Sequence, residues 1–172
     1  MINYDLSRIK AVVFDVDGVL SANQVPLGED GFPVRTVFIK DGYALHLALK
    51  LGLDIAIMTG GDTAPVRRRF EFMQVKHIYM GSHRKTEQMA DFLKTTGYAP
   101  VEVAYMGDDL PDFEVMQMVG LPCCPADASP EIKAISKYVS PFKGGGGCCR
   151  DLLEQILKVK GLWQSGPEAY IW

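Results

Sequence analysis

Three short, strongly apolar runs recur along the chain, and polar residues follow each of them. The runs are 9–14 (IKAVVF), 53–58 (LDIAIM) and 101–106 (VEVAYM). Their length and their branched residues predict strands that are buried on both faces. Helical patterns separate the runs, and strands that alternate with helices predict an α/β fold with a doubly wound parallel sheet. The 172 residues are expected to form a single domain, 1–172.

The segments between these strands carry signals for helix ends. Asp41 is expected to cap a helix that Gly52 ends, and Pro65 suits the first turn of the next helix. Further elements are expected as a short strand at 77–79, helices over 85–95, 113–118 and 149–160, and weaker α and β signals over 130–139.

The segment of about 21–39 is the one sizeable insertion that the pattern predicts. It carries Asp30-Gly31 between two extended-looking stretches, which predicts a β-hairpin. Few residues separate the other predicted elements along the sequence, so there is no room for a second domain. The C-terminal tail, 161–172, is rich in aromatic residues, among them Trp163 and Trp172, and such a chain end is expected to be docked on a protein surface.

Composition narrows the class of protein. The chain is 48% hydrophobic and 23% charged, as in ordinary globular domains, and its net charge of −3 provides no basic field for nucleic acid or an anionic membrane. No apolar run is long enough to span a bilayer, and residues 1–10 lack the apolar stretch of a signal peptide. The cysteines form two adjacent pairs without zinc or redox spacing, so reduced thiols and a cytoplasmic location are expected. They are Cys123, Cys124, Cys148 and Cys149.

Polar side chains follow all three strong strands. Asp15 and Asp17 follow the first strand, Thr59 follows the second, and Asp108 and Asp109 follow the third. Parallel strands bind ligands beyond their carboxyl ends, so these side chains are expected to meet at one edge of the sheet. Carboxylates at close range raise one another's pKa and cannot all stay ionised without a cation. The sequence therefore predicts a divalent cation with oxygen ligands, and Mg²⁺ suits carboxylates together with a phosphate.

The spacing of these residues indicates phosphoryl chemistry. Asp15 and Asp17 lie two positions apart, so in an extended chain their side chains leave on the same side. One can then attack phosphorus while the other transfers a proton. Gly18 permits a sharp turn, Lys85 supplies the positive charge that a phosphoryl group needs, and Thr59 supplies a hydrogen-bond donor. Each feature alone fits a cap or a solvated surface residue, whereas the ordered set is specific.

At these positions the chain resembles the haloacid dehalogenase superfamily of phosphatases. The matching motifs are Asp15-Val16-Asp17-Gly18-Val19, Thr59, Lys85, and Gly107-Asp108-Asp109 with Asp112. The resemblance implies a nucleophilic Asp15, an acid and base at Asp17, and Mg²⁺ bound by Asp15, the Asp17 backbone carbonyl and Asp108. It further implies that Asp109 and Asp112 orient the waters on the metal and Lys85. The gaps between motifs are short, so the chain is similar to the capless subclass.

Within that subclass the chain resembles the family of 3-deoxy-D-manno-octulosonate 8-phosphate phosphatases. The matching segments are 38–43 (FIKDGY), Arg69, and the glycine run 144–147 with Arg150. The resemblance implies hydrolysis of a sugar-acid phosphate in lipopolysaccharide precursor synthesis, by a homotetramer whose subunits complete one another's sites. Gly61 and Gly146 stand where many relatives carry a charged residue. A nine-carbon, sialic-acid-type 9-phosphate is therefore an alternative substrate.

Several residues are expected to contact this substrate. They are Asp17, Lys40, Asp41, Gly42, His46, Gly60, Arg69, Lys85 and Asp109. Arg69 belongs to a run of three arginines that point in different directions on a helix, and it is the candidate partner of the sugar's carboxylate. His46 and His83 fit a structural role equally well. The residues also leave open a mutase, which must shield its intermediate from water, and a non-catalytic accessory module of sugar-acid activation.

Overall fold

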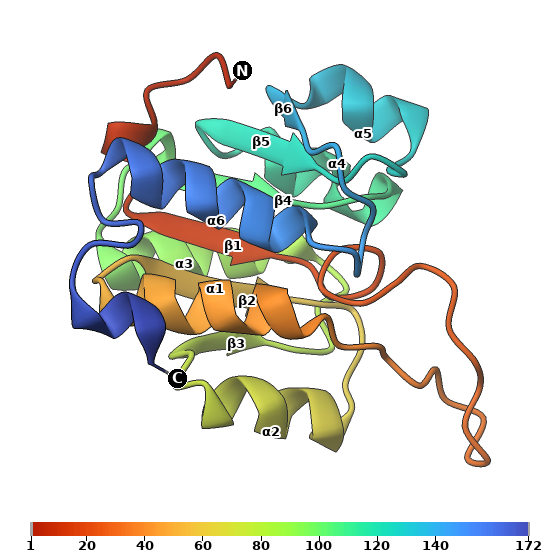
Figure 1. The fold of residues 1–172 in the computed structure, drawn as a ribbon. Coiled ribbons are helices and arrows are strands. Elements are labelled where there is room, and N and C mark those ends of the chain that lie inside the picture. The colour runs from red at the N-terminus through yellow and green to blue at the C-terminus, as the bar shows by residue number, and fades with distance from the viewer. Residues whose placement is uncertain (1, 172) are drawn as a thin grey trace.

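The computed structural model describes residues 2–171, and a parallel sheet forms its centre (Figure 1). The strands are β1 (Ala11–Phe14), β2 (Asp54–Met58), β3 (His77–Tyr79), β4 (Val103–Met106), β5 (Leu121–Cys124) and β6 (Tyr138–Val139). Within the described residues they form one six-stranded sheet in the order β3-β2-β1-β4-β5-β6, and all the pairs are parallel. The predicted doubly wound α/β fold is confirmed.

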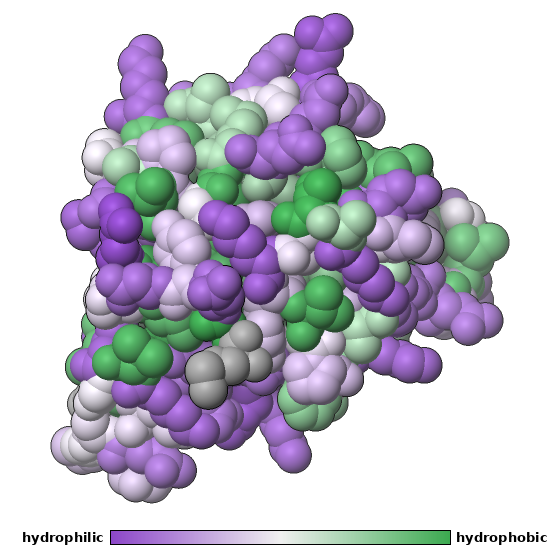
Figure 2. All heavy atoms as spheres, turned by 90° about the horizontal axis from the view of Figure 1, so that it is seen from above, coloured by the Kyte–Doolittle hydropathy of each residue, from purple (hydrophilic) through white to green (hydrophobic). Residues whose placement is uncertain are grey.

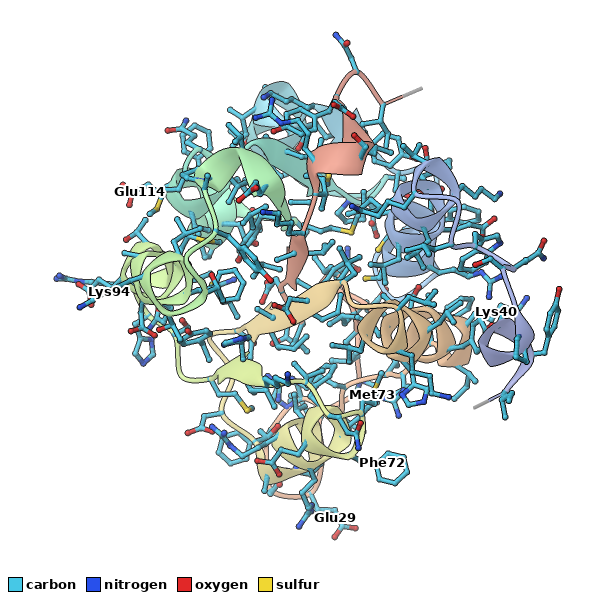
Figure 3. All side chains as sticks on the ribbon, turned by 90° about the vertical axis from the view of Figure 1, so that its left-hand side faces the viewer. Glu29, Lys40, Phe72, Met73, Lys94 and Glu114 are labelled. Atoms are coloured by element: carbon cyan, nitrogen blue, oxygen red, sulfur yellow. The ribbon has the colours of Figure 1, made fainter. Side chains whose placement is uncertain are left out.

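Helices cover both faces of the sheet. The α-helices are α1 (Ile39–Lys50), α2 (Ala64–Phe72), α3 (Lys85–Thr96), α4 (Phe113–Met116), α5 (Pro130–Ile135) and α6 (Cys148–Val159). The 3₁₀ helices are η1 (Leu6–Arg8), η2 (Pro100–Glu102), η3 (Leu110–Asp112) and η4 (Pro167–Tyr170). Figure 3 shows α1 and α6 on one side of the sheet and α3 and α4 on the other. On the outer surface, the face seen in Figure 2 mixes hydrophilic and hydrophobic side chains.

The central strands bury their side chains on both faces. In β1, Val12 and Phe14 pack in the core under α1 and α6, while Ala11 and Val13 pack in the core under α3 and α4. All four side chains are fully buried. Burying a residue of the size of valine or phenylalanine contributes about 1.5–3 kcal/mol, so this alternation fixes the register of β1 between its neighbours.

Asp41 caps a different helix from the one that the sequence predicts. Helix α1 begins at Ile39 after Phe38, whose side chain makes no capping bond. The Oδ1 atom of Asp41 instead accepts a hydrogen bond of 2.7 Å from the backbone N–H of Arg150, in the first turn of α6. The expectation that Asp41 caps its own helix was wrong, because the side chain points across the interface between α1 and α6. Burial raises the pKa of Asp41 to about 6.

Asp41→Asn is expected to make stability less dependent on pH. A carboxyl group whose pKa is raised in the folded state stabilises most below its unfolded value, about 4, and that contribution is lost as pH rises to about 6. The asparagine keeps the Oδ1 acceptor, and the Oδ2 of Asp41 is buried without a hydrogen-bond partner. Urea unfolding at about pH 4 and about pH 7 measures the effect. The free energy of unfolding of wild type should fall relative to that of the variant at the higher pH. The same difference between the two proteins at both pH values would contradict this account.

The segment 21–39 is an extended loop rather than a hairpin of two strands. A single antiparallel bridge joins Leu27 to Pro33, and no strand forms within this segment. Pro26 and Pro33 remove backbone donors from both arms, which limits the ladder. The loop projects from the body beyond the carboxyl ends of the strands (Figure 1), and the side chains of Leu27 and Phe32 are 72% and 59% exposed.

The tail packs on its own subunit. The hydroxyl of Tyr43 in α1 donates a hydrogen bond to the carbonyl of Ala169, and the guanidinium of Arg150 lies 5.1 Å from the ring of Trp163. Figure 1 places this chain end on the opposite side of the molecule from the carboxyl ends of the strands. Tyr170 is 76% exposed, and Trp172 lies outside the described residues.

None of the described helices combines the length and apolar character that crossing a membrane requires. The side chains of all four cysteines are buried free thiols.

Candidate active site

The site lies where the order of the strands reverses. Helices α1 and α2 carry the chain outward from β1 on one face, and α3 then returns it to β4, the neighbour of β1 on its other side. Asp15 directly follows β1, and its backbone N–H donates a hydrogen bond of 3.1 Å to the carbonyl of Met106 in β4. Asp108 lies two residues beyond β4. The two carboxylates therefore meet at the crevice where doubly wound sheets bind their ligands.

Three carboxylates converge at this point. Oxygen atoms of Asp15, Asp108 and Asp112 lie within 4.8 Å of one another. Burial and the neighbouring charge of Asp112 raise the pKa of Asp15 to about 8 and that of Asp108 to about 7. Protein side chains alone thus do not fully offset the negative charge, and the set of oxygen donors fits a hard divalent cation.

Lys85 lies between two of these carboxylates. Its Nζ is 2.6 Å from Oδ1 of Asp112 and 3.1 Å from Oδ1 of Asp15, and its side chain is 5% exposed. It is the first residue of α3, so the helix start fixes its position beside the sheet. The same Oδ1 of Asp112 accepts a 2.6 Å hydrogen bond from the hydroxyl of Tyr105, whose pKa burial and Asp112 raise well above its usual value. Asp112 thus contacts both Lys85 and Tyr105, and the orienting role that the resemblance implies for this carboxylate stays a prediction.

Close backbone packing holds the loop after β1. A Cβ on Gly18, which has a φ of +80°, would lie 2.0 Å from Oδ2 of Asp108, so this position keeps space beside the carboxylates. The glycine run packs closely against this loop, because a Cβ on Gly144 would lie 1.9 Å from the carbonyl oxygen of Gly18. The N–H of Gly145 donates to the carbonyl of Val19 at 2.8 Å. Gly144 and Gly145 are therefore required by close packing against the loop after β1.

The carboxylates open into a cavity of about 650 Å³. Most of the candidate catalytic residues line it, together with part of the loop before α1. They are Asp15, Asp17, Thr59, Gly60, Lys85, Asp108, Asp109 and Asp112, and Gly61, Asn23 and His83 also lie on its wall. The side chain of Thr59 is almost fully buried and accepts a 3.1 Å hydrogen bond from the N–H of Gly61. The structure thus brings together residues that the sequence places in four separate motifs.

The other candidate substrate residues lie elsewhere. Asp41, Gly42 and Arg69 line a second cavity of about 280 Å³, and the loop before α1 also contributes to its wall. Burial lowers the pKa of Arg69. Their roles toward a substrate stay predictions.

Two further candidates line neither of these cavities. Lys40 is exposed on α1 (Figure 3), and His46 is half-buried on the same helix. Burial lowers the pKa of His46. The structure does not bring either residue to the carboxylates, and their substrate contacts stay predictions.

The sequence interpretation missed Arg35 and Tyr105. Arg35 donates two hydrogen bonds of 2.9 Å to the carboxylate of Asp17, from Nε to Oδ1 and from Nη2 to Oδ2. No motif marks this arginine, because the loop brings it back to the site over 18 residues of sequence. Tyr105 carried a signal that could have been used, since it is the polar member of the otherwise apolar stretch 103–106.

The doubly wound fold and the carboxylate cluster at the carboxyl ends of its strands are those of a hydrolase that acts on phosphate esters. A family model described as haloacid dehalogenase-like hydrolase matches residues 50–149, and the chain belongs to this family.

Relatives with known names are similar over most of the chain. The 3-deoxy-D-manno-octulosonate 8-phosphate phosphatase of Escherichia coli K12 is 35% identical over 154 residues, which are 90% of this chain and 82% of that protein. The crystal structure of the enzyme of the same name from Yersinia pestis has a TM-score of 0.87 at 32% identity and covers 91% of this chain and 85% of that one. A structure from Moraxella catarrhalis in complex with magnesium, phosphate and KDO has a TM-score of 0.86 at 30% identity, with 91% of each chain covered.

Proposed function

We propose that this protein is a Mg²⁺-dependent phosphatase that hydrolyses 3-deoxy-D-manno-octulosonate 8-phosphate to the free acid and phosphate, in the cytoplasm. The observation that carries the proposal is the convergence of Asp15, Asp108 and Asp112 beside an open cavity, with Lys85 paired to Asp15 and Asp112. The named activity of relatives 35% identical over 90% of the chain supports this choice of substrate. Buried free thiols are consistent with a reducing compartment.

The residues present fit a magnesium ion. Asp15 and Asp108 would hold it through carboxylate oxygens, together with the backbone carbonyl of Asp17, and the space that Gly18 leaves beside Asp108 keeps the position open. Magnesium, when bound, neutralises charge on the phosphoryl oxygens. Asp112 already accepts hydrogen bonds from Lys85 and Tyr105, which suits an orienting role.

The side chains support a two-step reaction. An oxygen of Asp15 attacks phosphorus, the bond from phosphorus to the sugar oxygen breaks, and Asp17 donates its proton to that oxygen. Asp17 then takes a proton from water as the water attacks the aspartyl phosphate, which releases phosphate and restores Asp15. Lys85 and Thr59 offer donors to the phosphoryl oxygens throughout, and such fixed donors act most strongly in a site with little water.

A substrate screen tests this function. Phosphate release is measured from the eight-carbon sugar-acid 8-phosphate, from a nine-carbon 9-phosphate and from an aryl phosphate, with Mg²⁺ and with EDTA. We expect the highest kcat/KM for the eight-carbon acid and no turnover in EDTA. Preference for the nine-carbon acid would change the substrate and keep the chemistry, whereas no release from any ester would overturn the function.

Asp108→Ala is expected to raise the Mg²⁺ concentration needed for half-maximal rate by roughly 10–100-fold, because the variant loses an anionic ligand. The rise in KM for the sugar-acid phosphate at saturating Mg²⁺ should be smaller. A titration of rate against Mg²⁺ measures the change, with Asp91→Asn, on the exposed side of α3, as the matched control. A titration identical to that of wild type would remove Asp108 from the metal site.

We further propose that the protein assembles as a homotetramer in which the loop 21–39 walls the site of a neighbouring subunit. An open cavity of about 650 Å³ needs an enclosing wall for a small sugar acid, and the loop tip exposes Leu27 and Phe32. The tail packs on its own subunit as far as Ala169, so the support for a shared wall comes mainly from the loop.

Replacing both Leu27 and Phe32 by serine is expected to reduce the molar mass measured by light scattering and to lower kcat/KM for the sugar acid by roughly tenfold, since less of the ligand is enclosed. Hydrolysis of the aryl phosphate should change less. The exposed residue Phe72, at the end of α2 (Figure 3), provides a control as Phe72→Ser. A monomeric wild type with full sugar-acid activity would contradict the shared wall.

A further inference from the structure

One ion pair outside the carboxylate cluster holds the side chain of Asp17, the proposed proton carrier, in place. The carboxylate of Asp17 receives both of its side-chain hydrogen bonds among the described residues from Arg35, each 2.9 Å long. The side chain of Arg35 is 11% exposed and that of Asp17 is 46% exposed, so the guanidinium is the buried partner. A bidentate pair sets the plane of a carboxylate as well as its position.

Gly61 makes room for this guanidinium. A Cβ on Gly61 would lie 2.6 Å from Nη2 of Arg35, closer than real contacts allow. Gly61 directly follows Thr59-Gly60 on the wall of the catalytic cavity. The cation next to Gly61 thus comes from the loop before α1, and it occupies space that a side chain at position 61 would fill.

The small contribution that this ion pair is expected to make to folding stability argues against a purely structural role. An ion pair with one partner 46% exposed contributes about 0–1 kcal/mol to folding, because water screens it. The loop gains its anchorage elsewhere: the N–H of Thr36 donates to Oγ of Ser21, and the N–H of Ala22 donates to Oγ1 of Thr36, both at 2.9 Å. The pair has more effect on where the carboxylate of Asp17 points than on whether the loop folds.

We propose that Arg35 is a positioning residue for the phosphatase reaction, which holds the Asp17 carboxylate on the wall of the catalytic cavity in the orientation needed for proton transfer. This inference rests on the proposed function, in which Asp17 protonates the leaving oxygen and deprotonates water. The loop before α1 is then part of the catalytic arrangement of its own subunit, and Gly61 is the residue that permits it.

The proposal predicts a dependence on the leaving group. An alkoxide leaving group needs a proton, whereas p-nitrophenolate leaves without one, and kcat/KM reports the steps up to the release of the leaving group. Arg35→Ala is therefore expected to lower kcat/KM for alkyl phosphates by roughly 10–100-fold, within the 10²–10⁴-fold that a general acid supplies. The value for p-nitrophenyl phosphate should fall by less than about threefold.

Three comparisons separate positioning from other roles. Glycerol phosphate has no carboxylate, so a loss with this substrate as large as with the sugar acid supports positioning, and a loss confined to the sugar acid overturns it in favour of substrate binding. Gly61→Ala should give the same selective loss as Arg35→Ala, because the added methyl group displaces the guanidinium. Arg35→Lys keeps the charge without the bidentate geometry and should restore part of the rate.

A double-mutant cycle with Asp17→Asn tests whether Arg35 acts through Asp17. In the Asp17→Asn background, Arg35→Ala should lower kcat/KM for glycerol phosphate by less than about twofold, and independent, additive losses would overturn the proposal. A readout without turnover accompanies the cycle: the Nε–H NMR signal of Arg35 should shift in Asp17→Asn and stay unchanged in the control Glu114→Gln. An unshifted signal would show that the pair does not exist in solution.

Mixing variants tests which subunit Arg35 serves. Arg35→Ala and Asp15→Asn subunits are unfolded together, refolded and assayed with glycerol phosphate. If Arg35 acts within its own subunit, the mixture should show no more than the summed activity of the separate variants. Recovery above that sum would place Arg35 in a neighbouring site and overturn the proposal as stated. Inactivity of wild type on every ester would instead be a failure of the proposed function.

Discussion

Asp15→Asn is expected to lower kcat by about 10⁶-fold, as in covalent catalysts that lose their nucleophile, on sugar-acid and aryl phosphates alike. An amide oxygen is too weak a nucleophile to attack phosphorus, so no aspartyl phosphate forms and hydrolysis through that intermediate stops. Because the defect lies in the first bond-forming step, a better leaving group should not rescue it. Rapid acid quenching followed by mass spectrometry should detect the phosphorylated peptide in wild type and not in the variant.

The stability of Asp15→Asn distinguishes lost chemistry from lost structure. Burial and the charge of Asp112 raise the pKa of Asp15 to about 8, so the ionised carboxylate is unfavourable in the folded protein without a metal. The neutral amide removes that cost, and the variant should unfold in EDTA at or above the temperature of wild type. Glu114→Gln, on the exposed side of α4 (Figure 3), is the control that should keep both activity and stability. Near-normal turnover by Asp15→Asn would refute the assignment of Asp15 as the nucleophile.

The sheet and the meeting of the candidate catalytic carboxylates could be predicted because they depend on local pattern. The apolar runs at 9–14 and 101–106 predicted two strands of one parallel sheet, and carboxyl ends of parallel strands lie at one edge. That single topological rule brought Asp15 and Asp108 together before any distance was known. The order of the strands itself required the structure, because several orders fit the same alternation of strands and helices.

Contacts across long stretches of sequence could not be predicted in the same way. Asp41 precedes an apolar helix pattern and so reads as its cap, yet the crossing of α1 and α6 turns its side chain to Arg150, 109 residues further on. Arg35 lies in a loop without periodicity, so nothing in the local pattern directs it to Asp17. The glycine run resembled a family feature, but the reason for a glycine at Gly144, contact with the carbonyl of Gly18, emerges only from the packed backbone.

Lys85→Met is expected to destabilise the protein in EDTA by about 3–5 kcal/mol, the cost of removing one partner from a buried ionic cluster. The methionine matches the length and apolar stem of lysine, so the loss comes from charge rather than from a cavity. The carboxylates of Asp15 and Asp112 would remain at the site without the ammonium group that lies 3.1 and 2.6 Å from them. Chemical unfolding of the variant and of Lys94→Met, an exposed lysine on the same helix (Figure 3), measures the difference.

Adding Mg²⁺, or adding the second substitution Asp112→Asn, tests whether charge causes the loss of stability in Lys85→Met. Mg²⁺ stabilises the folded state by binding it, and it should recover more stability in the variant than in wild type, because the variant has more uncompensated negative charge. Adding Asp112→Asn to Lys85→Met should also recover stability, since one buried carboxylate fewer remains. Both proteins should stay impaired in turnover by about 10²–10³-fold, as expected when one fixed donor to the reacting phosphoryl group is lost. If neither Mg²⁺ nor Asp112→Asn restores stability, then Lys85 supports the fold through packing, and its electrostatic role between the two carboxylates is refuted.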